Sequence, residues 1–199
     1  DPVMDKLNRV IYLPLDPKGV ILSPTTAAGD RPTGQAPGGV MLQRIHGNMD
    51  LPFTTSDGPT GFTDNGVAIG FARTAQGAAL AAAHYLGYMS SGPDRAAMLL
   101  EAGRLSDPHR EAIQDGETIP PGSPAGTYPL VKVVFDPDLT LVQFGVINRD
   151  DDGVRRIFYT KIPVVWRDGT GWVLKIDAGA GIYGTGVGSW PADGWHKWW

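Results

Sequence analysis

Apolar residues recur with a helical period in the middle of this chain. From Thr74 to Leu86 they lie three or four positions apart on one narrow face, which predicts a helix that begins at Thr74. Gly77 lies within this helix at a cost of about 1 kcal/mol relative to alanine, so we expect another backbone to pass close to it. Small residues make up most of the apolar face: Ala75, Ala78, Ala79, Ala82, Ala83 and Leu86.

Two shorter helices are predicted after this one. Residues 91–103 begin with the spacing of a capping box, from Ser91 to Asp94, and place Pro93 in the first turn. Residues 106–116 begin with Ser-Asp-Pro and end at Asp-Gly. Residues 118–127 are rich in proline and glycine, which argues against regular structure and marks the end of the helical part.

The apolar period then changes to two, which predicts four strands. Residues 128–135 and 139–148 form a hairpin around Asp136-Pro137-Asp138, and residues 154–166 and 172–176 form a second pair. Pro163 argues for an edge position or a bulge in the long third strand. Alternate residues of that strand share one face: Phe158, Thr160, Ile162, Val164 and Trp166.

The order of elements predicts an α+β fold shaped like a cone. We expect about three helices, N-terminal to the strands, to pack on a curved four-stranded antiparallel sheet. Residues 1–66 are interpreted as an irregular arm with short strands, residues 67–177 as the cone domain, and residues 178–199 as a Gly- and Trp-rich tail. The sequence leaves open whether the arm packs on the core.

Composition excludes several kinds of function. The net charge of −4 and the scattered Lys and Arg residues argue against nucleic-acid binding. Disulfides and thiol chemistry are excluded because the chain has no cysteine. No apolar run is long enough to span a membrane. Since the chain begins at Asp1, we expect that an upstream signal peptide or membrane anchor has been removed.

Two short motifs resemble ligand sites without the context that such sites need. Residues 179–184 match G-x-G-x-x-G, but no helix and no suitably placed acid follow, so we interpret them as a flexible tail. Residues 148–153 resemble half of a calcium loop, yet Tyr159 takes the place of the bidentate Glu, which favours an acidic hairpin turn. The four histidines lack metal-ligand spacing. We therefore predict no catalytic residue, no cofactor and no metal site.

The tail carries four of the six tryptophans: Trp190, Trp195, Trp198 and Trp199. An indole buries a large apolar area, so four of them in a tail need a surface to cover them. Two interpretations remain open. The tail folds back over the open face or edge of the sheet, or it forms a docking strip for a partner or a membrane interface.

Three segments carry a resemblance to a known family. These are Leu51-Pro52 with Asp57-Gly58-Pro59-Thr60, the helix block at residues 70–82, and residues 162–174 with the Trp-rich end. From Met41 onward the chain resembles an uncharacterised family of actinobacterial exported proteins, often encoded in conjugative or integrative elements. The resemblance implies a single N-terminal membrane anchor and a nuclear transport factor 2-like, or cystatin-like, cone. That cone is similar to the assembly-factor domain of type IV secretion systems.

From this resemblance we expect a non-enzymatic, extracytoplasmic scaffold of a conjugation or secretion apparatus. Its expected partners are membrane and channel proteins, with a homo-oligomer as a further expectation. The alternative is a small-molecule binder or an enzyme on the same cone, similar to ketosteroid isomerases and polyketide cyclases. Its candidate cavity residues are His84, Tyr85, Asp136 and Tyr159. A third possibility is a cell-envelope binding protein unrelated to conjugation.

Overall fold

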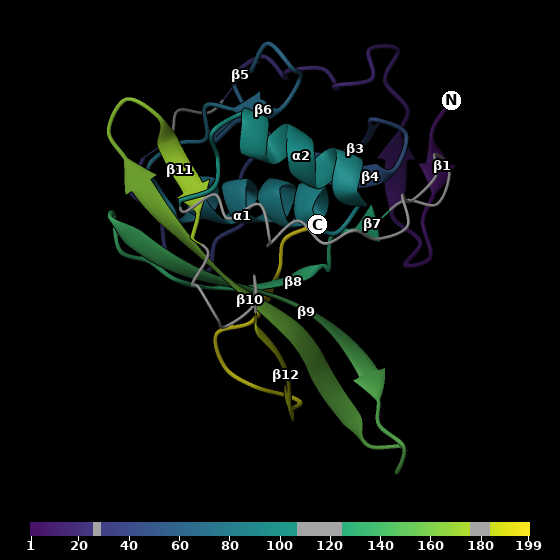
Figure 1. Ribbon diagram of the computed structural model, residues 1–199. Coiled ribbons are helices and arrows are strands. Elements are labelled where there is room, and N and C mark those ends of the chain that lie inside the picture. Colours follow the sequence, from purple (N-terminus) through teal and green to yellow (C-terminus); the bar gives the residue numbers. More distant parts are fainter. Residues whose placement is uncertain (26–28, 107–124, 176–183) are drawn as a thin grey trace.

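The computed structural model describes residues 1–25, 29–106, 125–175 and 184–199. These residues form two helices, a five-stranded sheet, a six-stranded sheet and a small two-stranded sheet (Figure 1). The first helix lies between the two large sheets and contacts both of them. Part of the six-stranded sheet extends away from the body as a long ribbon.

Helix α1 (Ala75–Met89) is buried on almost every side, which explains its small residues. It begins as predicted, because the Thr74 hydroxyl accepts a hydrogen bond from the Gly77 amide at 2.9 Å. The close approach at Gly77 is also confirmed, since a Cβ there would lie 1.9 Å from the Ala72 carbonyl oxygen. A helix with no exposed face needs cover from more than one sheet.

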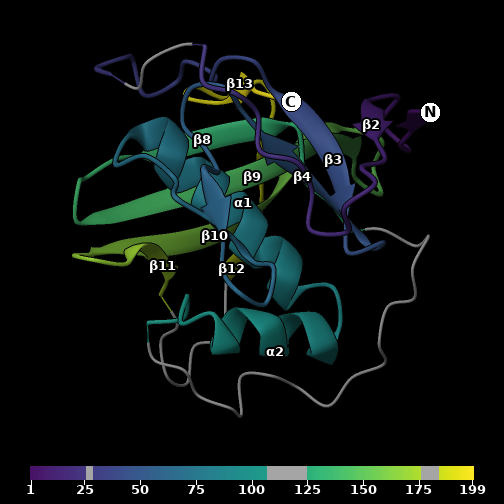
Figure 2. The same cartoon turned by 90° about the horizontal axis from the view of Figure 1, so that it is seen from above.

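Helix α2 (Pro93–Glu101) packs beside α1 on the side away from the six-stranded sheet (Figure 2). Its N-cap is Gly92, without a side-chain cap, so the predicted capping box at Ser91 is wrong. The Ser91 hydroxyl instead donates to the Gly87 carbonyl at 2.6 Å. Most of the helix predicted at residues 106–116 lies outside the described residues.

The six-stranded sheet contains the four predicted strands, which are confirmed with small shifts of their ends. Its order is β11-β10-β9-β8-β13, and β12 also pairs with β10; every pairing is antiparallel. The bounds are β8 (Leu130–Val134), β9 (Leu139–Arg149), β10 (Arg155–Arg167), β11 (Gly171–Leu174), β12 (Gly184–Ser189) and β13 (His196–Lys197).

A second large sheet comes mostly from the N-terminal residues. Its order is β1-β2-β3-β4-β7, and the β2–β3 and β4–β7 pairings are parallel. Residues 61–69 add a separate hairpin. The bounds are β1 (Val3–Met4), β2 (Val10–Tyr12), β3 (Met41–Ile45), β4 (Met49–Phe53), β5 (Gly61–Phe62), β6 (Ala68–Ile69) and β7 (Ala125–Gly126).

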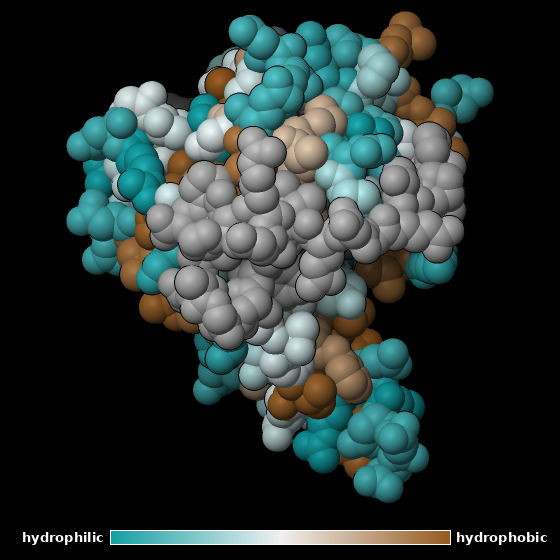
Figure 3. Space-filling model, viewed as in Figure 1, coloured by the Kyte–Doolittle hydropathy of each residue, from teal (hydrophilic) through white to brown (hydrophobic). Residues whose placement is uncertain are grey.

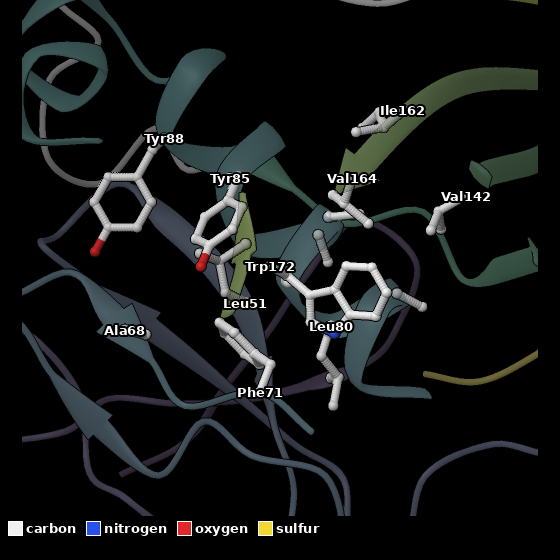
Figure 4. Packing of buried hydrophobic residues seen from close by; sticks show 14 of the residues in the cluster. Leu51, Ala68, Phe71, Leu80, Tyr85, Tyr88, Val142, Ile162, Val164 and Trp172 are labelled. Atoms are coloured by element: carbon white, nitrogen blue, oxygen red, sulfur yellow. The ribbon is translucent and has the colours of Figure 1, made fainter. Parts of the chain in front are cut away.

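This arrangement corrects the predicted fold. The described residues do not form three helices on a four-stranded sheet, because α1 has a sheet on each side. The segment 1–66 packs on the core, since Ile11, Ile45 and Phe53 are fully buried in the same cluster as α1. Figure 4 shows Leu51 of β4 near Tyr85 of α1, with Trp172 and Val164 of the other sheet close by.

Pro163 lies in the interior of β10, yet its missing N–H breaks no ladder. The amide of Lys175 donates to the Pro163 carbonyl at 3.0 Å, so this edge of β10 faces the end of β11. Here β11 stops pairing at Val164, and β12 begins to pair at Lys161. The proline nitrogen therefore points between two partner strands, where a local edge exists, as the sequence predicted.

The C-terminal strap, which we define as residues 190–199, crosses the six-stranded sheet and wraps around its β8 edge. Trp195 lies against Gly145 in the middle of the sheet, and β13 then pairs with β8 at the edge. Beyond that edge, Trp199 packs on Phe144, whose ring lies on the opposite face, at 6.2 Å between centroids. The strap thus contacts both faces of the sheet.

Candidate interaction surface

Of the two described helices, neither lies on the second face of the six-stranded sheet. The inner face packs against α1 through the fully buried Val142, Phe144, Ile162 and Val164. Strand residues alternate between the two faces, so the odd-numbered residues of β9 and β10 belong to the opposite side, which we call the outer face. The antiparallel register aligns their side chains across β8, β9 and β10.

An apolar cluster occupies the outer face near the β8–β9 hairpin. Val134, Leu141 and Pro163 form one row across three strands, and Leu139 pairs with Val165 in the next row. Val134 is 56% exposed and Leu139 is 45% exposed. In Figure 3 hydrophobic residues are visible at the lower left of the body, over this hairpin.

The charged residues of the outer face are all cationic. Lys132 and Lys161 flank Gln143 in the row next to the apolar cluster. No Asp or Glu occupies an outward position in any of the six described strands of this sheet. The carboxylates nearby lie in turns and in the strap. The outward cations are Lys132, Arg149, Arg155, Lys161, Arg167 and Lys197.

The strap divides the outer face into two areas. Its Trp195 ring lies 5.8 Å from the Tyr159 ring, and a Cβ on Gly145 would lie 3.0 Å from the indole. Tyr159 in turn covers Gly186 of β12, where a Cβ would meet the phenol at 2.5 Å. The apolar cluster and Lys161 lie on one side of this crossing, and the Arg149–Arg155 pair lies on the other. Lys132 borders the strap itself, since a Cβ on Gly194 would lie 3.1 Å from its Cε.

The four tail tryptophans have different environments. Trp198 and Trp199 are buried, and their indole N–H groups donate to the carbonyls of Gly34 and Tyr128, each at 3.0 Å. Trp190 and Trp195 are half-buried. Folding back over the sheet and its edge therefore describes the tail, and Trp198 and Trp199 present no exposed indole to a partner.

The structure does not bring the four cavity candidates together. His84 and Tyr85 are buried in the core between the sheets. Asp136 lies exposed in the β8–β9 turn, where its carboxylate accepts from the amides of Asp138 and Leu139. Tyr159 is on the outer face of β10. It lies six residues from Val165, whose partner Leu139 follows the β8–β9 turn, so Tyr159 is about 20 Å from that turn.

His84 has a structural environment. Its Nε2 donates to the Pro52 carbonyl at 2.8 Å, and the rings of Phe53 and Phe71 lie within 5.3 Å of it. Burial lowers the pKa of His84 to about 4, so the ring is neutral near pH 7. Burial also raises the pKa of the Tyr85 phenol. Neither side chain reaches solvent, where a substrate would enter.

The acidic hairpin predicted at residues 148–153 is confirmed, because β9 and β10 flank it directly. The Asp150 carboxylate accepts from the Val154 amide at 2.8 Å and pairs with Arg156 at 2.9 Å. The bond from Arg156 lowers the pKa of Asp150. Within the described ranges no three His, Asp or Glu side chains gather as metal ligands. The G-x-G-x-x-G motif at residues 179–184 lies almost entirely outside those ranges.

No helix in the described part of the chain is long and apolar enough to cross a membrane. The fold and the outer face define a mixed α and β protein with a central helix, two large sheets that contact it, and a cationic sheet face that the C-terminal strap crosses. A family model described as a domain of unknown function, DUF8175, matches residues 14–191, and the chain belongs to that family. No curated protein and no solved structure matches this chain.

The sequence suggests a sheet face as a place of contact but does not show which residues form it. The alternation in residues 154–166 places Phe158 to Trp166 on one face, and the opposite set runs from Arg155 to Arg167. Lys161 and Pro163 belong to that set, and their spacing of two is the signal that was present. Which residues join them from β8 and β9 depends on the register.

Proposed function

We propose that the protein is a non-enzymatic scaffold or assembly component of a conjugation or type IV secretion-like apparatus in an actinobacterium. The observation that carries this proposal is the outer face, which combines exposed apolar side chains with cations on a surface that neither described helix covers. Exposed apolar patches with charged rims are typical of protein interaction sites. The separation of His84, Asp136 and Tyr159 supports a function without catalysis.

The resemblance of residues 51–60, 70–82 and 162–174 to exported proteins of conjugative elements supports the cellular setting. In this proposal the folded part lies outside the cytoplasm and is exported or held by an N-terminal anchor. Its partners are membrane and channel proteins of the same apparatus, and nucleic acid is not among them. The function does not depend on a cone-shaped fold.

The proposal is tested by cross-linking the protein in its native host and purifying it by an affinity tag near the N-terminus. Mass spectrometry is expected to recover a membrane-channel component or a transfer ATPase. Recovery of the protein alone, or only with envelope proteins encoded outside the transfer element, contradicts the proposal.

A further inference from the structure

The apolar cluster and the cations around it form a continuous surface, which we call the lysine patch. Its apolar centre lies on β8, β9 and β10, and its cations border that centre along the strands. Lys161 and Arg167 are exposed, and Lys132 is half-buried. The patch consists of Val134, Leu139, Leu141, Pro163 and Val165 with Lys132, Lys161 and Arg167.

We propose that the lysine patch binds an acidic surface of another protein. This proposal rests on the scaffold function and names the chemistry of one partner. The first argument is that the patch departs from the normal pattern of a sheet with one side in water. Such a sheet carries polar residues on its solvent side, whereas here two adjacent rows are apolar and two of their members are about half exposed.

The second argument is electrostatic. The chain has 21 acidic and 17 basic residues, yet the outward positions of this sheet hold six of the basic residues and none of the acidic ones. Lys161 lies 5.7 Å from the Tyr159 ring, and no carboxylate pairs with Lys132 or Lys161 among the described residues. Carboxylates of a partner would neutralise Lys132 and Lys161, and such charge complementarity steers association.

Two other occupants fit less well. A second copy stacked face to face would bring together two sheet faces whose described strands carry cations and no carboxylate, which is repulsive. An anionic membrane lying on the patch would approach the carboxylates of Asp136, Asp138 and Asp168, which border it in the two adjacent turns. An acidic protein surface with an apolar centre can cover the patch while the two turns stay in water. Ordinary interfaces likewise have a buried apolar core and a polar rim that solvent reaches.

The test uses the full chain in its host, with a photo-crosslinking amino acid at Leu139 and, as a control, at Val187. Val187 is 58% exposed on β12 and lies outside the patch. Irradiation is expected to give an adduct from position 139 and none of the same mass from position 187. Peptide mapping should place the crosslink on a protein segment that is rich in Asp and Glu.

Charge reversal then tests the cations. The double variant Lys132→Glu/Lys161→Glu is expected to reduce the adduct about tenfold or more. Arg155→Glu, on the same strand and face but outside the patch, should leave the adduct unchanged, and both variants should keep the wild-type thermal midpoint. Replacement of the contacting Asp or Glu of the partner by Lys should restore the adduct with the double variant.

Several results would overturn the inference: no adduct at position 139, an adduct with a second copy or with lipid, or equal loss in both variants. Flotation with phosphatidylglycerol vesicles that depends on Lys132 and Lys161 would identify a membrane instead. If purification still recovers transfer proteins while position 139 gives no adduct, the scaffold function stands and the lysine patch is wrong. If position 139 crosslinks to an acidic protein that belongs to no transfer apparatus, the lysine patch stands and the scaffold function in that apparatus is wrong.

Discussion

His84 shows how one buried side chain links the helix to the N-terminal sheet. Strand β7 pairs only with Met49 and Asp50 of β4, so the Pro52 carbonyl lies beyond the end of that ladder. The His84 Nε2–H supplies the hydrogen bond that a further strand residue would have supplied. Its Nδ1 is buried and has no hydrogen-bond partner, which the neutral ring tolerates better than a charged one.

This burial predicts a loss of stability in mild acid. The pKa of His84 is about 4 in the folded protein and 6.5 when unperturbed, so the unfolded chain binds more protons between these values. The stabilisation is therefore complete above about pH 6.5 and is lost as the pH falls toward 4, by about 3 kcal/mol in total. Urea unfolding at pH 7.5 and pH 4.5 measures this difference.

His84→Gln is the matched variant, because an amide N–H can still donate to the Pro52 carbonyl without titrating. Its free energy of unfolding should change less between the two pH values than that of the wild type. The pKa of His46 is also lowered, by burial and by Arg95, but this contribution is common to both proteins and cancels. An equal pH dependence of the two proteins would show that His84 is not the group responsible.

Among the elements, those with a simple local period were predicted best. The alternation along β10 and the small-residue face of α1 are properties of neighbouring residues, and both elements appear where they were expected. The local sequence does not indicate strand β4, because all five of its residues are buried, so that no alternation is present, and Pro52 interrupts it. One of its neighbours, β7, comes from residues 125–126, so the pairing leaves no trace in the local sequence.

The candidate surface was harder to predict than the strands that carry it. Val134, Leu139 and Pro163 belong to three different strands, and only the register shows that they are neighbours. The tail tryptophans illustrate the same difficulty, since composition shows that they need cover but does not show which surface covers them. Long-range pairing decides both questions.

The strap is predicted to stabilise the fold through specific hydrogen bonds as well as through burial. Trp198→Phe keeps an aromatic ring but leaves the Gly34 carbonyl without the indole donor, which should cost about 1–2 kcal/mol. Trp198→Ala also removes the buried ring and should cost about 3–5 kcal/mol. Urea denaturation at pH 7.5 provides both values.

Trp190→Phe is the control within the same strap, because Trp190 is only half-buried. Its effect should be smaller than that of Trp198→Phe. If the two phenylalanine variants are equally stable, the bond to Gly34 does not contribute to stability.

At the scale of the whole molecule, one core joins both large sheets. Ile11, Ile45 and Phe53 from the N-terminal segment share it with Phe144 and Ile162 from the C-terminal sheet, around α1. Removal of the N-terminal sheet would expose the side of α1 that packs against β4. We therefore expect the N-terminal strands to be required for folding.

A chain that begins at residue 67 should accordingly fail to fold, although it retains α1 and the six-stranded sheet. Far-UV circular dichroism and size-exclusion chromatography should show lost structure or aggregation. Removal of residues 1–4, which takes away the short edge strand β1 and keeps the ion pair of Asp5 with Arg9, is the control and should leave a folded monomeric or native-sized species. A cooperative thermal transition in the chain 67–199 would contradict this expectation.

The hydrogen bond between Trp198 and Gly34 also bears on the order of events in folding. It joins residues 164 positions apart in the sequence, and the entropy cost of closing a loop rises with its length. We expect the strap to dock after the transition state, so Trp198→Phe should speed unfolding and leave the folding rate nearly unchanged in stopped-flow measurements. The strap would then set the lifetime of the folded molecule and have little influence on how fast it forms.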